Sequence, residues 1–262
     1  MSLDLWRNRN LQPIAAAPAR APNMVSAFGI SRTGAFPDWV SGNRWTSVAT
    51  PGLKVRPGLK SHPGGVGLDL NGSTHSVIAP TTYTTTNGSI LLYAYFPTTP
   101  PTGKTLASQS DNAYYGLGLD VSTTKFRLWV GGNPGQHIEA GTVSTGARVI
   151  LGTWGSAGLE LYLDGSLAGS DPAKTLSPTT SGGFNFEIGA FNYSGGRVLF
   201  ATETVLAFAI WSRRLPPTEA RLYSAQPWQI FRPLPRRIWL NAPTGEAPSA
   251  PKLRVMQSAL QW

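Results

Sequence analysis

The sequence of 262 residues contains no cysteine and an unusually small share of charged residues. The absence of cysteine excludes disulfide bonds and thiolate metal sites. Charged residues make up 13% of the chain, about half of the usual share, whereas glycine and proline are abundant at 29 and 22 residues. Coiled coils, helical bundles and helical repeats need the opposite composition and are excluded. No uninterrupted apolar run approaches the roughly twenty residues of a membrane-spanning helix.

The first residues also lack an export signal. Residues 1–10 are polar and charged, and the alanines at 15–17 are enclosed by Pro13 and Pro18. This leaves no apolar segment of the kind found in a secretory signal peptide. The sequence therefore predicts a soluble protein that is made and folded in a cytoplasm, with no membrane partner.

What the sequence does contain is a hydrophobic share of 41%, enough for a sizeable core, and an uneven distribution of charge. The net charge of +9 divides into +6 over residues 1–62, −1 over residues 63–228 and +4 over residues 229–262. Both ends are therefore basic, and the middle is nearly neutral. The length suits one large all-β domain.

Both ends are rich in proline and tryptophan. Proline fixes φ and donates no hydrogen bond, which favours extended segments, and tryptophan anchors such a segment on a surface. We therefore expect an extended basic N-terminal arm and lead-in over residues 1–62 and an extended basic C-terminal arm over residues 229–262. The arms either wrap over their own domain or reach neighbouring subunits. In the second case the subunit-anchoring residues are aromatic and basic: Trp6, Arg7, Arg9, Trp228, Phe231, Arg236, Arg237, Trp239 and Trp262.

The middle of the chain, over residues 63–212, alternates short apolar runs with turn signals, as antiparallel sandwiches and barrels do. In residues 159–164, Leu-Glu-Leu-Tyr-Leu-Asp, the leucines share one face, and the pair Asp164-Gly165 predicts a tight hairpin. Residues 90–96 and 205–211 are apolar on both faces, which predicts central strands. One short helix is expected over residues 218–224, after two prolines, and it must pack on the sandwich because two turns are unstable alone.

Four segments in this order resemble the laminin-G-like, concanavalin-A-like lectin/glucanase family. They are residues 67–73 (Gly-Leu-Asp-Leu-Asn-Gly-Ser), residues 88–96, the hairpin within 154–165, and pieces of 188–219 that close with Ser-Arg-Arg-Leu-Pro-Pro-Thr-Glu. The resemblance covers roughly residues 63–228. It implies an all-β, jelly-roll β-sandwich of two antiparallel sheets with one short helix, and we assign the sandwich to residues 63–228.

The stretch 220–233, Ala-Arg-Leu-Tyr-Ser-Ala-Gln-Pro-Trp-Gln-Ile-Phe-Arg-Pro, resembles the form of this domain in virion proteins of tailed bacteriophages. This resemblance implies a structural component of a virion, such as a capsid decoration or a neck or tail fitting. Its partners would be other virion proteins, with a homo-oligomer in the particle. Basic arms on a neutral β-domain fit this role, because capsid and tail proteins commonly link neighbours through such arms.

Enzymatic activity is not expected. Glycosidases of this fold use paired carboxylates, and the resemblance implies three acidic residues at i, i+2 and i+5 on one strand. Glu187 has no acidic residue at those offsets, and neither has Glu160. Glu160 and Asp164 share a strand face, but their Cα atoms would lie about 13 Å apart. A glycan hydrolase with a different carboxylate pair stays a third alternative.

Cofactors are not expected either. We interpret His62, His75 and His137 as solvated loop residues, because they lie in polar, turn-like sequence without a nucleophilic serine elbow. Asp111 and Asp120 bracket a loop, but a calcium ion needs six to eight converging oxygen ligands. No zinc spacing and no phosphate-binding glycine loop is present.

Carbohydrate binding to a host-surface glycan is the main alternative function. Tyr114, Tyr115 and Trp129 could stack on sugar rings, with Asp111 and Asn112 as polar partners. Against this, aromatic residues of a sandwich are more often buried in the core or in an interface.

Nucleic acid is the other partner that a sequence pI near 10.1 suggests. The arginines, however, are scattered singly apart from Arg236-Arg237, and no base-reading module is present. Acidic surfaces of neighbouring proteins would explain the same charge. We therefore predict a virion location, protein partners and no nucleic-acid partner.

Overall fold

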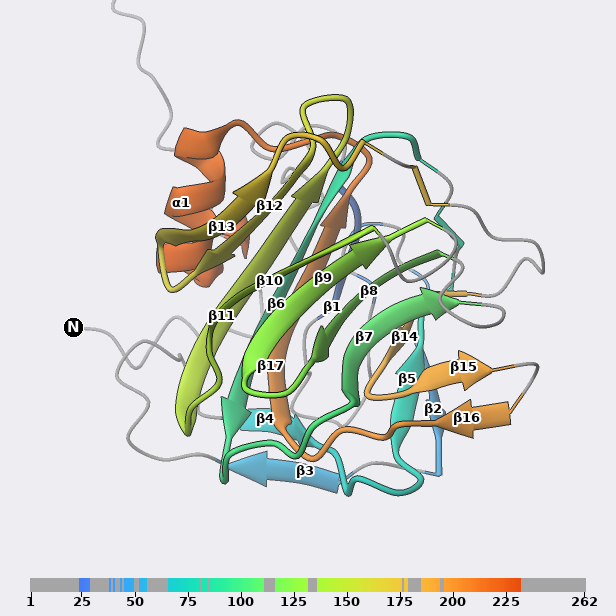
Figure 1. The fold of residues 1–262 in the computed structure, drawn as a ribbon. Helices are drawn as coiled ribbons and strands as arrows, with labels where there is room; N and C mark the ends of the chain where they lie inside the picture. The colour runs from blue at the N-terminus through green and yellow to red at the C-terminus, as the bar shows by residue number, and fades with distance from the viewer. Residues whose placement is uncertain are drawn as a thin grey trace, which may run out of the picture.

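The computed structural model describes residues 24–28, 38, 40, 43, 45–49, 52–55, 66–80, 82–83, 85–110, 116–131, 136–175, 177–178, 185–193 and 196–231. These residues form two large antiparallel sheets that pack face to face, a two-stranded hairpin and one α-helix (Figure 1). The expected jelly-roll sandwich with one short helix is confirmed. No helix in the described part of the chain is long and apolar enough to cross a membrane.

The larger sheet has eight strands in the order β13-β12-β11-β6-β17-β4-β3, with β1 paired to β17 beside β4. Its strands are β1 (Met24–Phe28), β3 (Gly52–Val55), β4 (Val66–Asp69), β6 (Gly88–Phe96), β11 (Gly146–Trp154), β12 (Leu159–Leu163), β13 (Ser166–Asp171) and β17 (Thr204–Trp211). The two strands that are apolar on both faces, β6 and β17, are central strands of the sheet, as expected, and they are neighbours in it.

The second sheet has seven strands in the order β10-β9-β8-β7-β14-β5-β2. They are β2 (Thr46–Val48), β5 (Ser76–Ile78), β7 (Lys104–Ser110), β8 (Gly116–Val121), β9 (Lys125–Val130), β10 (His137–Thr142) and β14 (Glu187–Ile188). The strands β15 (Phe191–Tyr193) and β16 (Gly196–Val198) form the separate hairpin.

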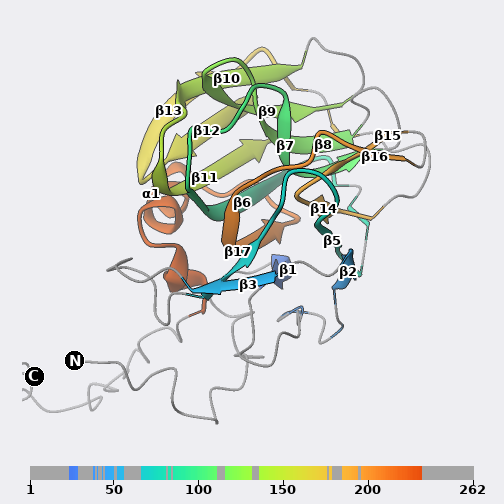
Figure 2. The same ribbon diagram turned by 90° about the horizontal axis from the view of Figure 1, so that it is seen from below.

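The central strands of the larger sheet are buried on both sides. Leu92 and Phe208 face the second sheet in the main core, whereas Leu91 and Trp211 belong to a second cluster on the opposite side. The helix α1 (Pro217–Ala225) and the 3-10 helix η3 (Pro227–Phe231) contribute to that second cluster. Figure 2 shows α1 on the side of this sheet that faces away from β8 and β9. Each large apolar side chain buried here contributes about 1.5–3 kcal/mol, which explains why β6 and β17 carry no polar face.

Two local predictions are confirmed in detail. Asp164 and Gly165 have φ values of 48° and 91°, the left-handed conformation that a tight hairpin between β12 and β13 requires. The helix expected over residues 218–224 is α1, and Tyr223 holds it to the sheet by stacking on Trp211 at a centroid distance of 5.8 Å. Arg213, just before the helix, forms an ion pair of 2.6 Å with Glu219 in the first turn of α1.

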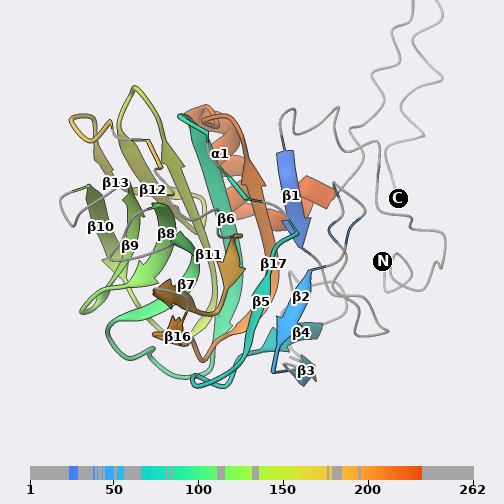
Figure 3. The same cartoon turned by 90° about the vertical axis from the view of Figure 1, so that its right-hand side faces the viewer.

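The sandwich begins earlier than residue 63, the boundary expected from the sequence. Strands β1, β2 and β3 all lie before it and join the two sheets (Figure 3). Trp45 is 3% exposed and packs edge-on against Phe208 in the main core, so it is not an arm residue. These strands have three to five residues. Their local signal is weak because long-range pairing, rather than local propensity, holds them in place.

Candidate functional site

The candidate site is the outer face of the seven-stranded sheet, the face that points away from the main core. Leu117, Leu119 and Val121 of β8 belong to that core, so the alternation of a strand directs Gly118 and Asp120 outward. In the register of the sheet, Asp120 lies opposite Arg127 of β9, and Arg127 lies opposite Glu139 of β10. Three charged residues thus form one row across three strands.

Arg127 binds Asp120 through two parallel hydrogen bonds. Its Nε donates to Asp120 Oδ1 at 2.7 Å, and its Nη2 donates to Oδ2 at 2.6 Å. The Asp120 side chain is only 4% exposed, against 21% for Arg127. Burial raises the pKa of Asp120, and the hydrogen bond and charge of Arg127 oppose that rise. Both oxygens of this carboxylate are therefore engaged by one guanidinium.

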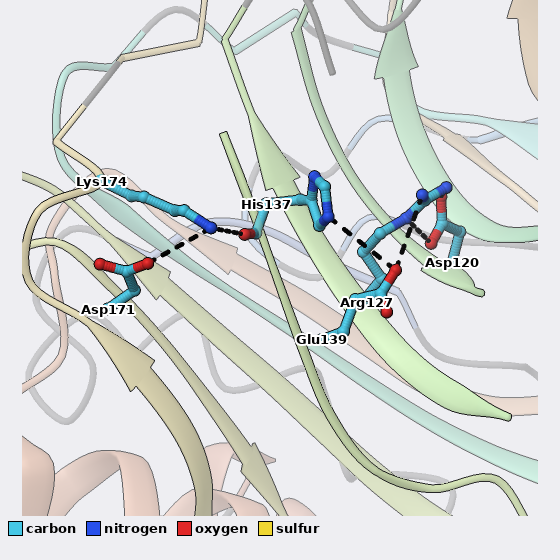
Figure 4. A network of polar contacts seen from close by, with 6 residues as sticks. All are labelled: Asp120, Arg127, His137, Glu139, Asp171 and Lys174. Atoms are coloured by element: carbon cyan, nitrogen blue, oxygen red, sulfur yellow. Dashed lines mark hydrogen bonds and ion pairs between the residues drawn. The ribbon is translucent and has the colours of Figure 1, made fainter. Parts of the chain in front are cut away.

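The row continues to the edge of the larger sheet (Figure 4). Glu139 Oε1 lies 3.9 Å from both Arg127 Nη1 and His137 Nε2. Lys174, from the turn after β13, donates to the His137 carbonyl oxygen at 2.5 Å and pairs with Asp171 at 3.3 Å. His137 was expected in a loop but lies on strand β10, where its side chain is 34% exposed. The network thus joins the edge strands of the two sheets.

A second buried carboxylate lies on the same face and is also bound by arginine. Glu187 of β14 is 3% exposed, and Arg197 of β16 approaches its Oε1 at 2.6 Å. The Ser76 hydroxyl donates to the same oxygen. Because β16 supplies the arginine, the β15–β16 hairpin and the sheet are tied together at this carboxylate.

The two buried carboxylates are not spaced like the pair of a retaining glycosidase. The two carboxyls of a retaining enzyme lie about 5–5.5 Å apart, whereas Asp120 and Glu187 are on strands separated by β7, which puts them roughly 10 Å apart. Each carboxylate is also bound by an arginine, Asp120 by Arg127 and Glu187 by Arg197. Among the described residues, no group of three or more His, Cys, Asp or Glu could hold a metal ion.

The carbohydrate-binding prediction is only partly covered by the structure. Trp129 is 4% exposed, with its indole packed over Gly118 and against Phe191 at a centroid distance of 5.9 Å. The structure thus corrects its expected role as an exposed stacking platform, because the alternation of β9 puts it on the outer face but the neighbours cover it. Asp111, Asn112, Tyr114 and Tyr115 lie outside the described residues.

The subunit-anchoring predictions are mostly not covered. Trp228 and Phe231 are part of η3, whose Ile230 is buried in the second cluster. Trp6, Arg7, Arg9, Arg236, Arg237, Trp239 and Trp262 lie outside the described residues.

Sequence reasoning missed the two arginine–carboxylate pairs. The pair Arg127–Asp120 could have been found. Each residue is a sequence neighbour of an apolar residue, Leu128 or Leu119, that points into the core, so the alternation of a strand puts both charged residues on the outer face. The pair Glu187–Arg197 gave no such signal, since it depends on how a hairpin folds over a sheet.

Comparisons with known proteins agree with this fold. A family model described as the concanavalin A-like lectin/glucanases superfamily matches residues 70–221. A comparison with curated proteins finds no match.

Several solved structures are similar at low sequence identity. Domain 4 of the extracellular arabinanase AbnA from Geobacillus stearothermophilus, in complex with arabinotriose, has a TM-score of 0.59 and 12% identity, over 78% of this chain and 99% of that one. The Trypanosoma rangeli sialidase with the inhibitor DANA has a TM-score of 0.56 and 16% identity over 80% of this chain. The match spans only 34% of the sialidase. The binding domain of botulinum neurotoxin DC in complex with SialylT has a TM-score of 0.54 and 15% identity, over 77% of this chain and 50% of that one.

Proposed function

The chain belongs to the concanavalin A-like lectin/glucanases superfamily, and we propose that it is a non-catalytic structural component of a bacteriophage virion. In this proposal the sandwich faces outward and the basic ends bind neighbouring virion proteins. The observation that carries the non-catalytic part is the pairing of both buried carboxylates of the outer face, Asp120 and Glu187, with arginines.

The virion part of the proposal rests on the ends of the chain. Residues 232–262 contain five basic residues and one acidic residue, and residues 1–23 contain three and one. The stretch 220–233, which resembles a phage virion form of this domain, begins in helix α1 and continues through η3, and Ala220, Tyr223 and Ile230 pack in the second cluster on the larger sheet. A neutral body with basic ends suits attachment to acidic surfaces of other subunits.

Deleting residues 1–23 or residues 232–262 should abolish incorporation into particles while leaving a folded sandwich. These limits spare β1 and η3, which are part of the fold. Incorporation is measured by immunoblotting purified particles after complementation with tagged variants, and folding is measured by circular dichroism and thermal unfolding. Full incorporation of both truncated chains would contradict the proposal, whereas an unfolded truncated chain would assign the ends to the sandwich itself.

Glycan binding is a second candidate, favoured by the family and by relatives of this fold whose structures hold arabinotriose or SialylT. Since Trp129 is buried, the stacking residues of this proposal are Tyr114 and Tyr115, in the segment between β7 and β8. The double substitution Tyr114→Ala/Tyr115→Ala should lower retention on a column of host-surface polysaccharide at least tenfold. The matched control, Tyr114→Phe/Tyr115→Phe, keeps both rings and should keep retention.

The same polysaccharide also separates binding from catalysis. Equal retention of the Ala and Phe variants on the column would contradict glycan binding by Tyr114 and Tyr115. Release of reducing sugar that disappears in Glu187→Gln would instead contradict the non-catalytic proposal and favour a hydrolase.

A further inference from the structure

The chain contains the same reactive tripeptide, Asn-Gly-Ser, at two places. The two copies are residues 71–73 and 87–89, and no other asparagine of the sequence is followed by glycine. An asparagine before glycine is prone to deamidation, because glycine has no Cβ and its backbone nitrogen can approach the side-chain carbonyl carbon without a steric clash. Since the two tripeptides are identical, a difference in their reactivity in the folded protein comes from the structure.

The Asn71 side chain is exposed, but its amide is held at both polar atoms. Its Oδ1 accepts the three backbone N–H groups of residues 73–75 at 3.1, 2.9 and 3.0 Å, and its Nδ2 donates to Thr74 Oγ1 at 2.8 Å. The nitrogen that would attack is engaged as well, since the Gly72 N–H donates to the Ala201 carbonyl oxygen at 2.8 Å. Ring closure at Asn71 therefore has to break these hydrogen bonds first.

The Asn87 side chain is also exposed, but its amide is held weakly. Its Oδ1 accepts the N–H of Ser156 at 3.3 Å, and its Nδ2 donates to Thr86 Oγ1 at 3.4 Å. Both distances exceed the usual value of about 2.9–3.0 Å. The Asn87 amide can therefore turn towards the following nitrogen at a smaller cost than the Asn71 amide.

The glycine that makes Asn87 reactive is required by the packing of the sandwich. Gly88 is the first residue of β6, and its register partner Trp154 is the last residue of β11. A Cβ atom on Gly88 would lie 2.1 Å from Cζ2 of Trp154, so no other residue fits there without displacing the indole. Gly88 also lies at the end of this ladder, where local opening costs least.

We propose that Asn87 is a site of spontaneous deamidation in the folded protein and that Asn71 is protected from the same reaction. The Gly88 nitrogen gives its proton to hydroxide and attacks Cγ of Asn87, the new N–Cγ bond closes a succinimide ring, and the Cγ–Nδ2 bond breaks to release ammonia. Water then opens the ring at either carbonyl carbon, which gives aspartate or isoaspartate. One water is consumed and one ammonia is released without oxidation, and a negative charge appears at the start of β6.

Mass spectrometry of the full-length protein tests this inference, which does not depend on the proposed function. The protein is incubated at mildly alkaline pH in oxygen-18 water, and tandem spectra locate the label. Asn87 should be converted about tenfold or more faster than Asn71, because fewer and longer hydrogen bonds have to break. In urea, where the fold is lost, the two identical tripeptides should react at the same rate. Asn87→Gln should remove the reaction at residue 87 and leave Asn71 unchanged.

A second variant tests the protection of Asn71 separately. Thr74→Val removes the acceptor of the Asn71 Nδ2 hydrogen bond at an exposed position, so conversion of Asn71 in the folded protein should become severalfold faster while conversion of Asn87 stays the same. The inference would be overturned if Asn71 reacted as fast as Asn87 in the folded protein, or if Asn87 stayed unmodified over a period in which the unfolded chain is converted.

Discussion

Replacing Arg127 with methionine is expected to destabilise the protein by about 3–5 kcal/mol, the cost of leaving a buried charge without its partner. Asp120, whose side chain is 4% exposed, would keep its carboxyl in the sheet face without the two hydrogen bonds from the guanidinium. Methionine retains most of the side-chain volume, so the loss reports the ion pair rather than packing. Urea unfolding followed by circular dichroism measures the change.

A matched control is available on the other sheet. Arg148 pairs with Asp164 at 2.8 Å, but that carboxylate is 40% exposed, so water replaces the arginine and Arg148→Met should cost less than about 1 kcal/mol. Adding Asp120→Asn to Arg127→Met should recover part of the loss, because the buried group is then neutral. If Arg127→Met and Arg148→Met lowered the free energy of unfolding by similar amounts, the buried ion pair between Arg127 and Asp120 would be contradicted.

Replacing Glu203 with glutamine is expected to stabilise the protein at neutral pH. Glu203 is 1% exposed, and in the described part of the chain neither of its carboxyl oxygens accepts a hydrogen bond. Burial raises its pKa to about 8, while the nearby N–H groups of Glu203 and Thr202, which do not reach hydrogen-bond geometry, and the charge of Lys104 lower it by less. The folded protein thus holds a proton on this carboxyl at pH 7, which the unfolded chain releases.

The sign of the pH dependence follows from this difference. Above a pH of about 4.5 the unfolded chain loses the proton while the folded protein keeps it, so stability falls as the pH rises and levels off near pH 8. Glutamine removes this loss, a gain on the order of 3 kcal/mol at pH 7. Below pH 4 both proteins should be equally stable.

Unfolding free energies between pH 4 and pH 9 test this prediction. If the unfolding free energy of Glu203→Gln still fell as the pH rose from 4.5 to 8, a group other than Glu203 would cause the pH dependence.

Local features of the fold could be predicted from the sequence because their causes are local. The hairpin at Asp164-Gly165 requires positive φ at both residues, and the structure has it. The helix start is set by Pro216 and Pro217, and α1 begins at Pro217. The two-sided burial of β6 and β17 follows directly from runs without polar residues.

Features that depend on distant pairing could not be predicted in the same way. Trp45 falls within residues 1–62, the range assigned to the arm and lead-in, yet it lies next to β2 and packs against Phe208 in the main core. Trp129 was predicted to stack on sugar rings because it is aromatic, but Phe191 of a later hairpin packs against it. In both cases the deciding neighbour lies more than sixty residues away in the sequence.

The most direct test of a sandwich attached by its basic ends is lysine cross-linking of intact particles, followed by mass spectrometry. The expected result is that Lys252, in the C-terminal segment, is linked mainly to other proteins of the particle, while Lys125, exposed at the start of β9, is not. Attachment through the basic ends would be contradicted if Lys252 were cross-linked only to the sandwich of its own chain, or if purified particles did not contain the protein.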